Sequence, residues 1–181
     1  MAFFYFGHGD PERDKFVPMA RAVLSQLLTQ DPSLLLHVEK ISTSSGQAVL
    51  SSRSLAKELL ETALKSRKTY VILDGIDECT RDDRKDVCTW FRSFADSLPT
   101  AKQDEIRCLF VSQDDGFARK DLAMLPTLGI TEKETREDIS EYALHWQKRI
   151  EERFGSLQDL GLAIAKIVPE RSQGELSPVN S

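Results

Sequence analysis

The segment at residues 70–79, Tyr-Val-Ile-Leu-Asp-Gly-Ile-Asp-Glu-Cys, constrains the fold more than any other part of the chain. The apolar run of residues 70–73 leads directly into three carboxylates, Asp74, Asp77 and Glu78. A continuous apolar run of this length is typical of a parallel strand that is covered on both faces. Ligands of open α/β sheets gather beyond the carboxyl ends of such strands. We therefore expect Asp74 to lie at that end of a buried strand.

The glycine after Asp74 helps to assemble a site there. Glycine turns the backbone without a Cβ penalty, so Gly75 lets Asp77 and Glu78 return toward Asp74. Three carboxylates at one edge repel one another unless a cation lies between them. The pattern is that of a Walker B motif, whose aspartate holds magnesium in nucleotide-binding proteins. The sequence therefore predicts a magnesium site at Asp74.

The motif that normally accompanies such a site is absent from the sequence. A phosphate-binding loop reads Gly-x-x-x-x-Gly-Lys followed by Ser or Thr, and its backbone N–H groups and lysine hold the phosphates. None of the nine glycines begins this pattern. Half of the expected nucleotide site is therefore missing from these 181 residues.

Composition limits the class of protein. The 181 residues, 40% of them hydrophobic, suffice for one domain of ordinary size. A net charge of -5 argues against a nucleic-acid or anionic-membrane binder. No stretch approaches the ~20 apolar residues of a spanning helix, so we expect a cytoplasmic location and no membrane partner. Cys79, Cys88 and Cys108 are odd in number and form no Cys-x-x-Cys pair, so neither disulfides nor a zinc site is expected.

Apolar patterns predict strands and helices in alternation. Strands are expected at residues 3–6, 70–73 and 108–111, with a weak last strand at 127–130. Helical periodicity is found at residues 20–28, 34–38, 55–64, 87–98 and 139–150, with one helical turn at 122–125, a Ser-rich loop at 42–54 and a capping box at Thr135 and Asp138. This alternation implies right-handed crossovers and a three-layer α/β fold with a parallel sheet and flanking helices.

The last part of the chain differs in composition. We expect the α/β domain at residues 1–153 and a C-terminal helical extension at residues 154–168, where the apolar pattern of residues 157–167 continues. Residues 169–181 are small, polar or proline and are expected to form a disordered tail.

The order of these segments resembles the NACHT module of STAND-class P-loop NTPases, and fungal NACHT proteins in particular. The resemblance covers roughly residues 3–150 in motif order. It rests on the strand at 3–6, the helix end Arg-Ala-Val-Leu-Ser-Gln-Leu-Leu at 21–28, the Leu-Asp-Gly-Ile-Asp-Glu-Cys run at 73–79 and Leu-Phe-Val-Ser at 109–112. In that family the phosphate-loop strand lies in the middle of the sheet, and the first strand of this chain corresponds to the family's second.

The resemblance thus implies a P-loop NTPase-like fold that is incomplete, because its first strand and phosphate loop are missing. The strand at residues 108–111 then lacks a partner on one side, unless residues 127–130 fill the gap. An open apolar edge promotes association with protein partners or with another copy of the chain.

The resemblance also implies an ATP- or GTP-dependent signalling switch that uses Mg²⁺. Asp74 matches the aspartate that holds magnesium, and Asp77 and Glu78 match the acids that position or activate the attacking water. Ser112 matches the end of the family's sensor strand. Gln113 stands where the family often has an arginine, which weakens the stabilisation of transition-state charge.

Three functional interpretations follow. The first is a partial NACHT-type switch with Walker B and sensor regions that binds or hydrolyses ATP or GTP poorly by itself. The second is a degenerate, non-catalytic protein-interaction module, which has the same fold but does not bind Mg-ATP. A weaker third is a metal-dependent phosphodiesterase that uses the acidic trio alone, against which the lack of accompanying His ligands counts.

Overall fold

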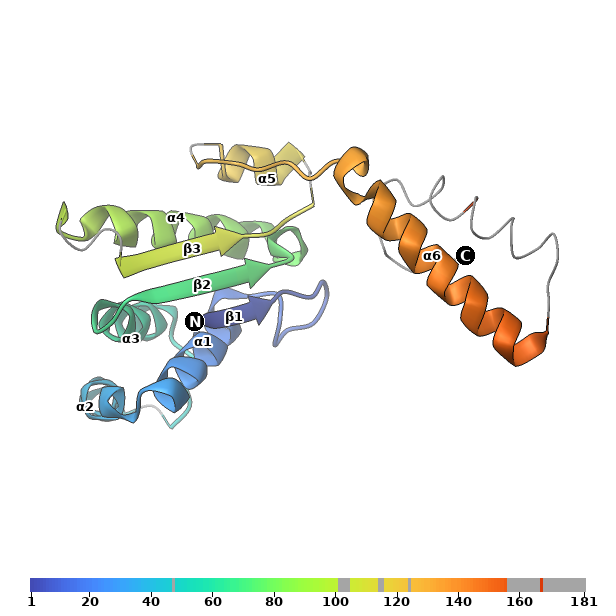
Figure 1. Cartoon of the computed structure of the whole chain (residues 1–181). Coiled ribbons are helices and arrows are strands. Elements are labelled where there is room, and N and C mark those ends of the chain that lie inside the picture. Colours follow the sequence, from blue (N-terminus) through green and yellow to red (C-terminus); the bar gives the residue numbers. More distant parts are fainter. Residues whose placement is uncertain (47, 101–104, 114–115, 124, 156–166, 168–181) are drawn as a thin grey trace. The chain divides into compact units, whose positions relative to one another are not determined.

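A computed structural model describes residues 1–46, 48–100, 105–113, 116–123, 125–155 and 167 (Figure 1). The chain divides into two compact units, Met1–Leu125 and Pro126–Ser181. The first unit contains β1 (Ala2–Tyr5), β2 (Thr69–Asp74) and β3 (Ile106–Phe110). They form one parallel sheet in the order β1-β2-β3. The predicted α/β fold with a parallel sheet is confirmed, and β2 is its central strand.

The helices of this unit lie between its strands or follow β3, and polar side chains cap several of them. They are α1 (Phe16–Gln30), α2 (Leu35–Ser45), α3 (Arg53–Lys65), α4 (Arg81–Ser97) and α5 (Gly116–Asp121), with the 3-10 turns η1 (Pro32–Leu34) and η2 (Ile76–Glu78). Ser52 begins α3 by accepting the Leu55 amide, and Thr80 begins α4 by accepting the Asp83 amide. Such caps satisfy N–H groups that have no partner within the helix.

One face of the sheet is covered by helices and forms the core. The Phe91 ring of α4 lies 6.1 Å from the Phe110 ring of β3, in an edge-to-face arrangement. On the central strand, Val71 is 1% and Leu73 is 0% exposed. The same core cluster contains Ala2, Phe4 and Phe6 from the first strand region, Met19 and Val23 from α1, Leu59 and Leu60 from α3, and Val87 and Phe94 from α4.

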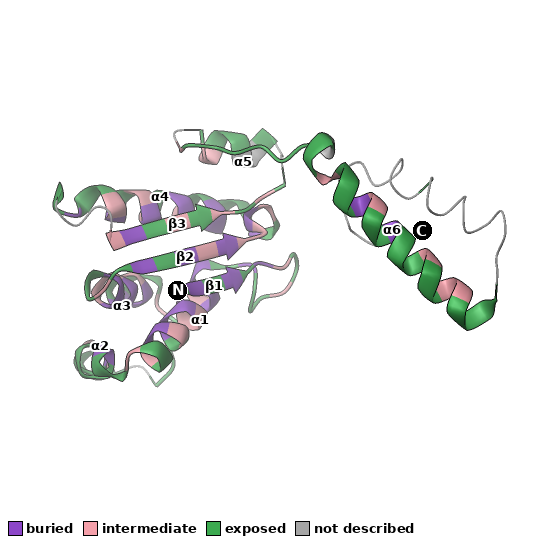
Figure 2. Cartoon of the chain, viewed as in Figure 1, coloured by how far each residue is buried: buried purple, intermediate pink, exposed green. Residues whose placement is uncertain are grey.

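The opposite face of the same strands is open to solvent. Tyr5 is 54%, Tyr70 46% and Leu109 56% exposed, and Figure 2 shows the strands alternating between buried and exposed residues. No described helix of Met1–Leu125 packs on this face, because α1, α3 and α4 share the core on the other side. We call it the bare face, and it comprises Phe3, Tyr5, Tyr70, Ile72, Leu109 and Val111.

The covering of β2 on both faces, expected from its apolar run, is therefore not found in this unit. The expected strand at residues 127–130 is also wrong, because those residues form neither helix nor strand. In the described chain β3 consequently has a neighbour on one side only. Ser42–Ser45, expected in a loop, instead complete the last turn of α2, which ends at Gly46 in a left-handed conformation (φ 67°) that suits glycine.

The second unit contains α6 (Glu132–Phe154). The expected capping box is present but lies four residues earlier, at Thr131 and Glu134, because that pair has the same spacing as Thr135 and Asp138. Ile139 is 1% exposed. The expected helix at residues 157–167 falls almost wholly outside the described residues, and the tail at 169–181 does so entirely. None of the described helices is long and apolar enough to span a membrane.

Candidate functional site

The predicted site residues lie at the carboxyl edge of the sheet, as parallel strands require. β2 ends at Asp74, and Gly75 then adopts a left-handed conformation (φ 69°) that reverses the chain into η2. Ile76, fully buried, anchors this turn, and its amide donates to the Val111 carbonyl at 3.0 Å. The Val111 amide in turn donates to the Leu73 carbonyl at 2.9 Å. The ends of β2 and β3 are thus tied together.

Asp74 has the carboxylate with fewest constraints at this edge. Its backbone carbonyl accepts the Phe6 amide at 2.9 Å, which fixes the chain after β1 against β2. Its side chain is half-buried, and no described residue donates a hydrogen bond to it. A half-buried carboxylate without donors is suited to an incoming cation or to a ligand that carries one.

Asp77 and Glu78 are already engaged by neighbouring loops. The Gln113 amide donates to Asp77 Oδ1 at 3.0 Å, and the His8 amide donates to Glu78 Oε2 at 2.9 Å. The two acids therefore position the loops that follow β3 and β1. Their long-range partners gave no signal in the sequence, since His8 and Glu78 are 70 positions apart.

The sensor position lies at the same edge. Ser112 is half-buried and its hydroxyl donates to the Gln113 carbonyl at 2.8 Å, while Gln113 is exposed. The amide of Gln113 links this segment to Asp77, so the structure brings the sensor and the acidic segment together. The Gln113 side chain is neutral and supplies no cationic charge for a phosphate at this position.

The acids do not form a metal centre by themselves. Within the described residues, no group of three or more His, Cys, Asp or Glu side chains could hold a metal ion. Magnesium, however, is commonly bound through one or two carboxylates, with water and substrate phosphates completing its octahedron. Asp74 fits that kind of ligand, whereas the phosphodiesterase interpretation, which needs the trio alone, gains no support.

A buried polar network beneath this edge was not predicted from the sequence. Asp83, 6% exposed, accepts the Phe16 amide and the Thr80 hydroxyl, both at 3.0 Å. Arg53 adds an ion pair to Asp83 at 2.5 Å. The network joins the starts of α1, α3 and α4. Its partners come from separate helices, so sequence spacing gives no sign of them.

The cysteine next to the acids is not a nucleophile. Burial, with smaller contributions from Asp83 and Asp14, raises the pKa of Cys79 to about 12. Its thiol donates to the Asp14 carbonyl at 3.1 Å. A thiolate is the reactive form of cysteine, so Cys79 is inert at neutral pH.

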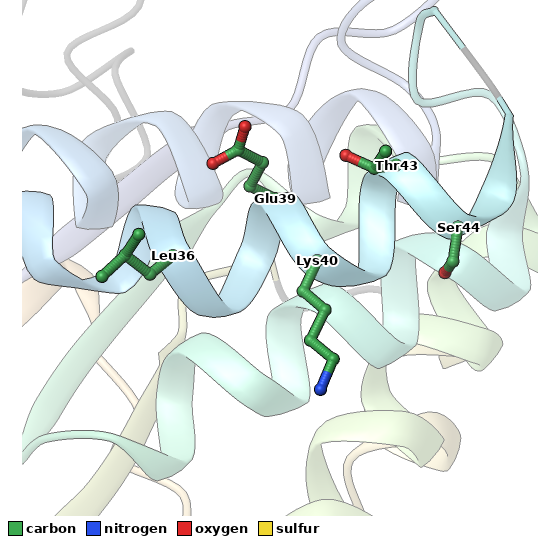
Figure 3. Close-up of a pocket in the computed structure, with 5 residues that line it drawn as sticks. All are labelled: Leu36, Glu39, Lys40, Thr43 and Ser44. Carbon is green, nitrogen blue, oxygen red and sulfur yellow. The ribbon is translucent and has the colours of Figure 1, made fainter.

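Two surface hollows lie away from the carboxyl edge. One is bordered by α1, α2 and α3, with Leu24, Leu28 and Val38 among its lining residues. The other is lined by Leu36, Glu39, Lys40, Thr43 and Ser44, all from α2 (Figure 3). Figure 3 shows Glu39 and Lys40 pointing to opposite sides of this helix. Side chains that diverge in this way do not form a binding site.

The structure is therefore that of an α/β domain with a parallel sheet and with acidic residues in the loop that follows its central strand. Residues 1–113 match the family described as Nephrocystin 3, N-terminal. This is more than half of the chain, and the chain belongs to that family. The domain is one found N-terminal to NACHT in nephrocystin-3-like proteins and is distinct from the NACHT module expected from the sequence. Comparison with curated proteins found no match, and comparison with solved structures found none either.

Proposed function

We propose that this domain is the magnesium-binding half of a nucleotide-dependent signalling switch in a NACHT-associated protein. In this proposal Asp74 would hold Mg²⁺, and water together with the phosphates of ATP or GTP would fill the remaining positions. The observation that carries it is the half-buried Asp74 carboxylate, which ends the central parallel strand and accepts no hydrogen bond from a described residue. This is where ligands of α/β sheets bind.

The neighbouring acids have complementary roles in the proposal. Asp77 and Glu78 each accept one backbone hydrogen bond through a single carboxylate oxygen. The remaining oxygens, Asp77 Oδ2 and Glu78 Oε1, are left to orient a water molecule toward the terminal phosphate. Gln113 offers no positive charge there, so hydrolysis by this chain alone is expected to be slow or absent.

The open edge of β3 supports a site that is completed from elsewhere. Within the described residues β3 pairs only with β2. A strand that carries a phosphate-binding loop can add to this edge through backbone hydrogen bonds. Its loop would then emerge at the carboxyl edge, where Asp74 and Ser112 lie. The protein partner in this proposal is therefore the segment or chain that supplies the loop.

Calorimetric titration of the chain with ATP and GTP, with and without Mg²⁺, tests the proposal. We expect weak binding, with a Kd of about 0.1–1 mM, because the phosphate-binding half is missing. Binding should require Mg²⁺ and be abolished by Asp74→Asn. Asp96→Asn is the matched control, since Asp96 is an exposed aspartate on α4 that is remote in sequence from the edge. Binding that ignores Mg²⁺, or that survives Asp74→Asn, would contradict the proposal.

The second candidate is a non-catalytic protein-interaction module. The observation that favours it is that Asp77 and Glu78 both hold loops through backbone hydrogen bonds, which is a structural role. This candidate predicts no nucleotide binding at millimolar concentration in the same titration. That result would replace the switch by the interaction module.

A further inference from the structure

We propose that the bare face of the sheet is the contact surface of a homodimer, in which it packs against the bare face of a second copy. The face is contiguous across all three strands. Phe3 of β1 pairs with Ile72 of β2, and Ile72 pairs with Leu109 of β3. In the row toward the carboxyl end Tyr5 pairs with Asp74, and in the row toward the amino end Tyr70 pairs with Arg107. A parallel sheet normally has both faces covered, and an exposed apolar patch rimmed by polar residues marks an interaction site.

The size of the bare face suits a weak dimer. Phe3, Tyr5 and Tyr70 are 45%, 54% and 46% exposed, and Leu109 and Val111 are 56% and 41% exposed. With side-chain areas of about 150–250 Å² for aromatic residues, this leaves roughly 400–500 Å² of bare surface on each copy. Two copies would bury roughly 800–1,000 Å² in total, which reaches the size of about 1,000 Å² expected of a specific interface only at its upper end. We therefore expect association at micromolar concentrations or above.

The charges at the two ends of the face favour a second copy over an unrelated partner. Glu105 lies with Arg67, Lys68 and Arg107 at the amino end of the strands, whereas Arg13 lies with Asp10, Asp74, Asp77 and Glu78 at the carboxyl end. The amino end thus carries an excess of positive charge and the carboxyl end an excess of negative charge. When the strands of the second copy run in the opposite direction, the positive end of each copy faces the negative end of the other. The surface is then electrostatically complementary to itself.

A two-fold axis perpendicular to the strands produces that arrangement. Lys68 and Asp74 lie three residues before and three residues after Val71. Side chains alternate along the strand, so both residues fall on the same face as Tyr70 and Ile72. With the axis near Val71, Lys68 of each copy approaches Asp74 of the other. Packed sheets lie about 10 Å apart with their strands about 30° from alignment, which long side chains at the rim can span.

Sedimentation equilibrium of the 181-residue chain tests the contact. We expect a mass that rises with concentration from 20.4 kDa toward twice that value. Leu109 belongs to the row of Phe3, Ile72 and Leu109 that crosses the centre of the bare face. Leu109→Lys should therefore keep the mass at the monomer value. Leu36→Lys is the control, because Leu36 is 74% exposed on α2 and away from the sheet. A monomer at hundreds of micromolar, or a dimer unaffected by Leu109→Lys, would overturn the proposal.

Charge reversal tests the orientation. Lys68→Glu and Asp74→Lys each place like charges opposite one another twice in the dimer, so each variant alone should associate at least tenfold more weakly. An equimolar mixture of the two restores opposite charges at both contacts and should recover a heterodimer. Equal association of all samples would refute the antiparallel arrangement. These measurements read mass in the absence of nucleotide and Mg²⁺, so their failure would not decide the proposed function. Since Asp74 faces Lys68 in the dimer, the dimer and the Mg²⁺-bound form compete for this carboxylate.

Hydroxyl-radical footprinting distinguishes a second copy from coverage within one chain. Tyr5 and Tyr70 should be oxidised readily at concentrations where the protein is monomeric and become protected as the dimer forms. Protection of both tyrosines in the monomer would mean that another segment of the same chain covers the face, which would overturn the proposal. Circular dichroism of each variant checks that the fold is retained.

Discussion

The two faces of the sheet are made by the same strands but differ completely in what covers them. Leu73 points into the core and is fully buried, whereas Leu109, on the neighbouring strand and the opposite face, is 56% exposed. Both are leucines in a parallel sheet, so intrinsic propensity does not distinguish them. The described unit is therefore stabilised by packing on one face of the sheet, while the other face remains exposed.

Truncation of these two leucines should change the free energy of unfolding by very different amounts. Leu73→Ala should lower the free energy of unfolding by about 2–5 kcal/mol, because it leaves a cavity in a packed core. Leu109→Ala should change it by about 0.5 kcal/mol or less at monomeric concentration, as is usual for exposed side chains. Urea denaturation measures both. Equal losses would mean that the bare face is covered in the monomer.

The hydrogen bonds that the buried Asp83 carboxylate accepts give the next largest effect. Asp83→Ala leaves the Phe16 amide and the Thr80 hydroxyl without their acceptor and should cost about 2–4 kcal/mol. Asp82→Ala, on the exposed neighbouring position in the first turn of α4, should cost only about 0.3–1 kcal/mol through the helix dipole. Thermal unfolding of both variants provides the comparison. A loss as small for Asp83 as for Asp82 would show that the network contributes no net stability.

The thiols beside the core predict a pH dependence. Burial raises the pKa of Cys79 to about 12 and of Cys88 to about 11, above the ordinary value of 9.0. A raised thiol pKa means that the folded state keeps its proton longer than the unfolded state does. The stabilisation is therefore complete below pH 9 and is lost above it, by up to about 1.4 kcal/mol per thiol per pH unit.

Urea denaturation between pH 8 and pH 10.5 measures this effect. The Cys79→Ala variant should show a shallower decline than the wild type. A thiol reagent at pH 8 should react with Cys79 and Cys88 only when the protein unfolds. Rapid labelling of the native protein would contradict their burial.

The smallest effects distinguish the acids of the carboxyl edge. Asp77→Ala removes the acceptor of the Gln113 amide and should cost about 0.5–1.5 kcal/mol. Asp74→Ala removes a carboxylate without a described donor and should leave stability nearly unchanged. The same urea titration measures both variants. A larger loss for Asp74 than for Asp77 would assign Asp74 a structural role and weaken the proposed function.

Sequence patterns predicted the elements with strong local signals. The β2 strand, the helical stripe of α4 and the turn at Gly75 follow from short stretches of chain, and all three are present. The bare face could not be predicted, because an apolar run indicates a strand but does not reveal which other elements cover it. The prediction of a strand at residues 127–130 was wrong for a related reason. So short a segment forms a strand only when a neighbouring strand pairs with it, and the local sequence does not show whether one does.

The candidate site was predicted in part. The position of Asp74 at the end of the central strand follows from the local pattern. The engagement of Asp77 by Gln113 and the Asp83 network do not, because they depend on contacts between residues far apart in sequence. Phe16 and Asp83, for example, are separated by 67 positions.

Paramagnetic NMR shows whether Asp74 holds the metal ion. Mn²⁺-ATP replaces Mg²⁺-ATP and broadens the amide signals of residues near the bound ion. We predict that the signals of Gly75, Ser112 and Gln113 broaden first in the wild type and remain sharp in Asp74→Asn, with signals of α2 unaffected in both. No broadening at millimolar Mn²⁺-ATP, or broadening that is centred away from the carboxyl edge, would contradict metal binding at Asp74.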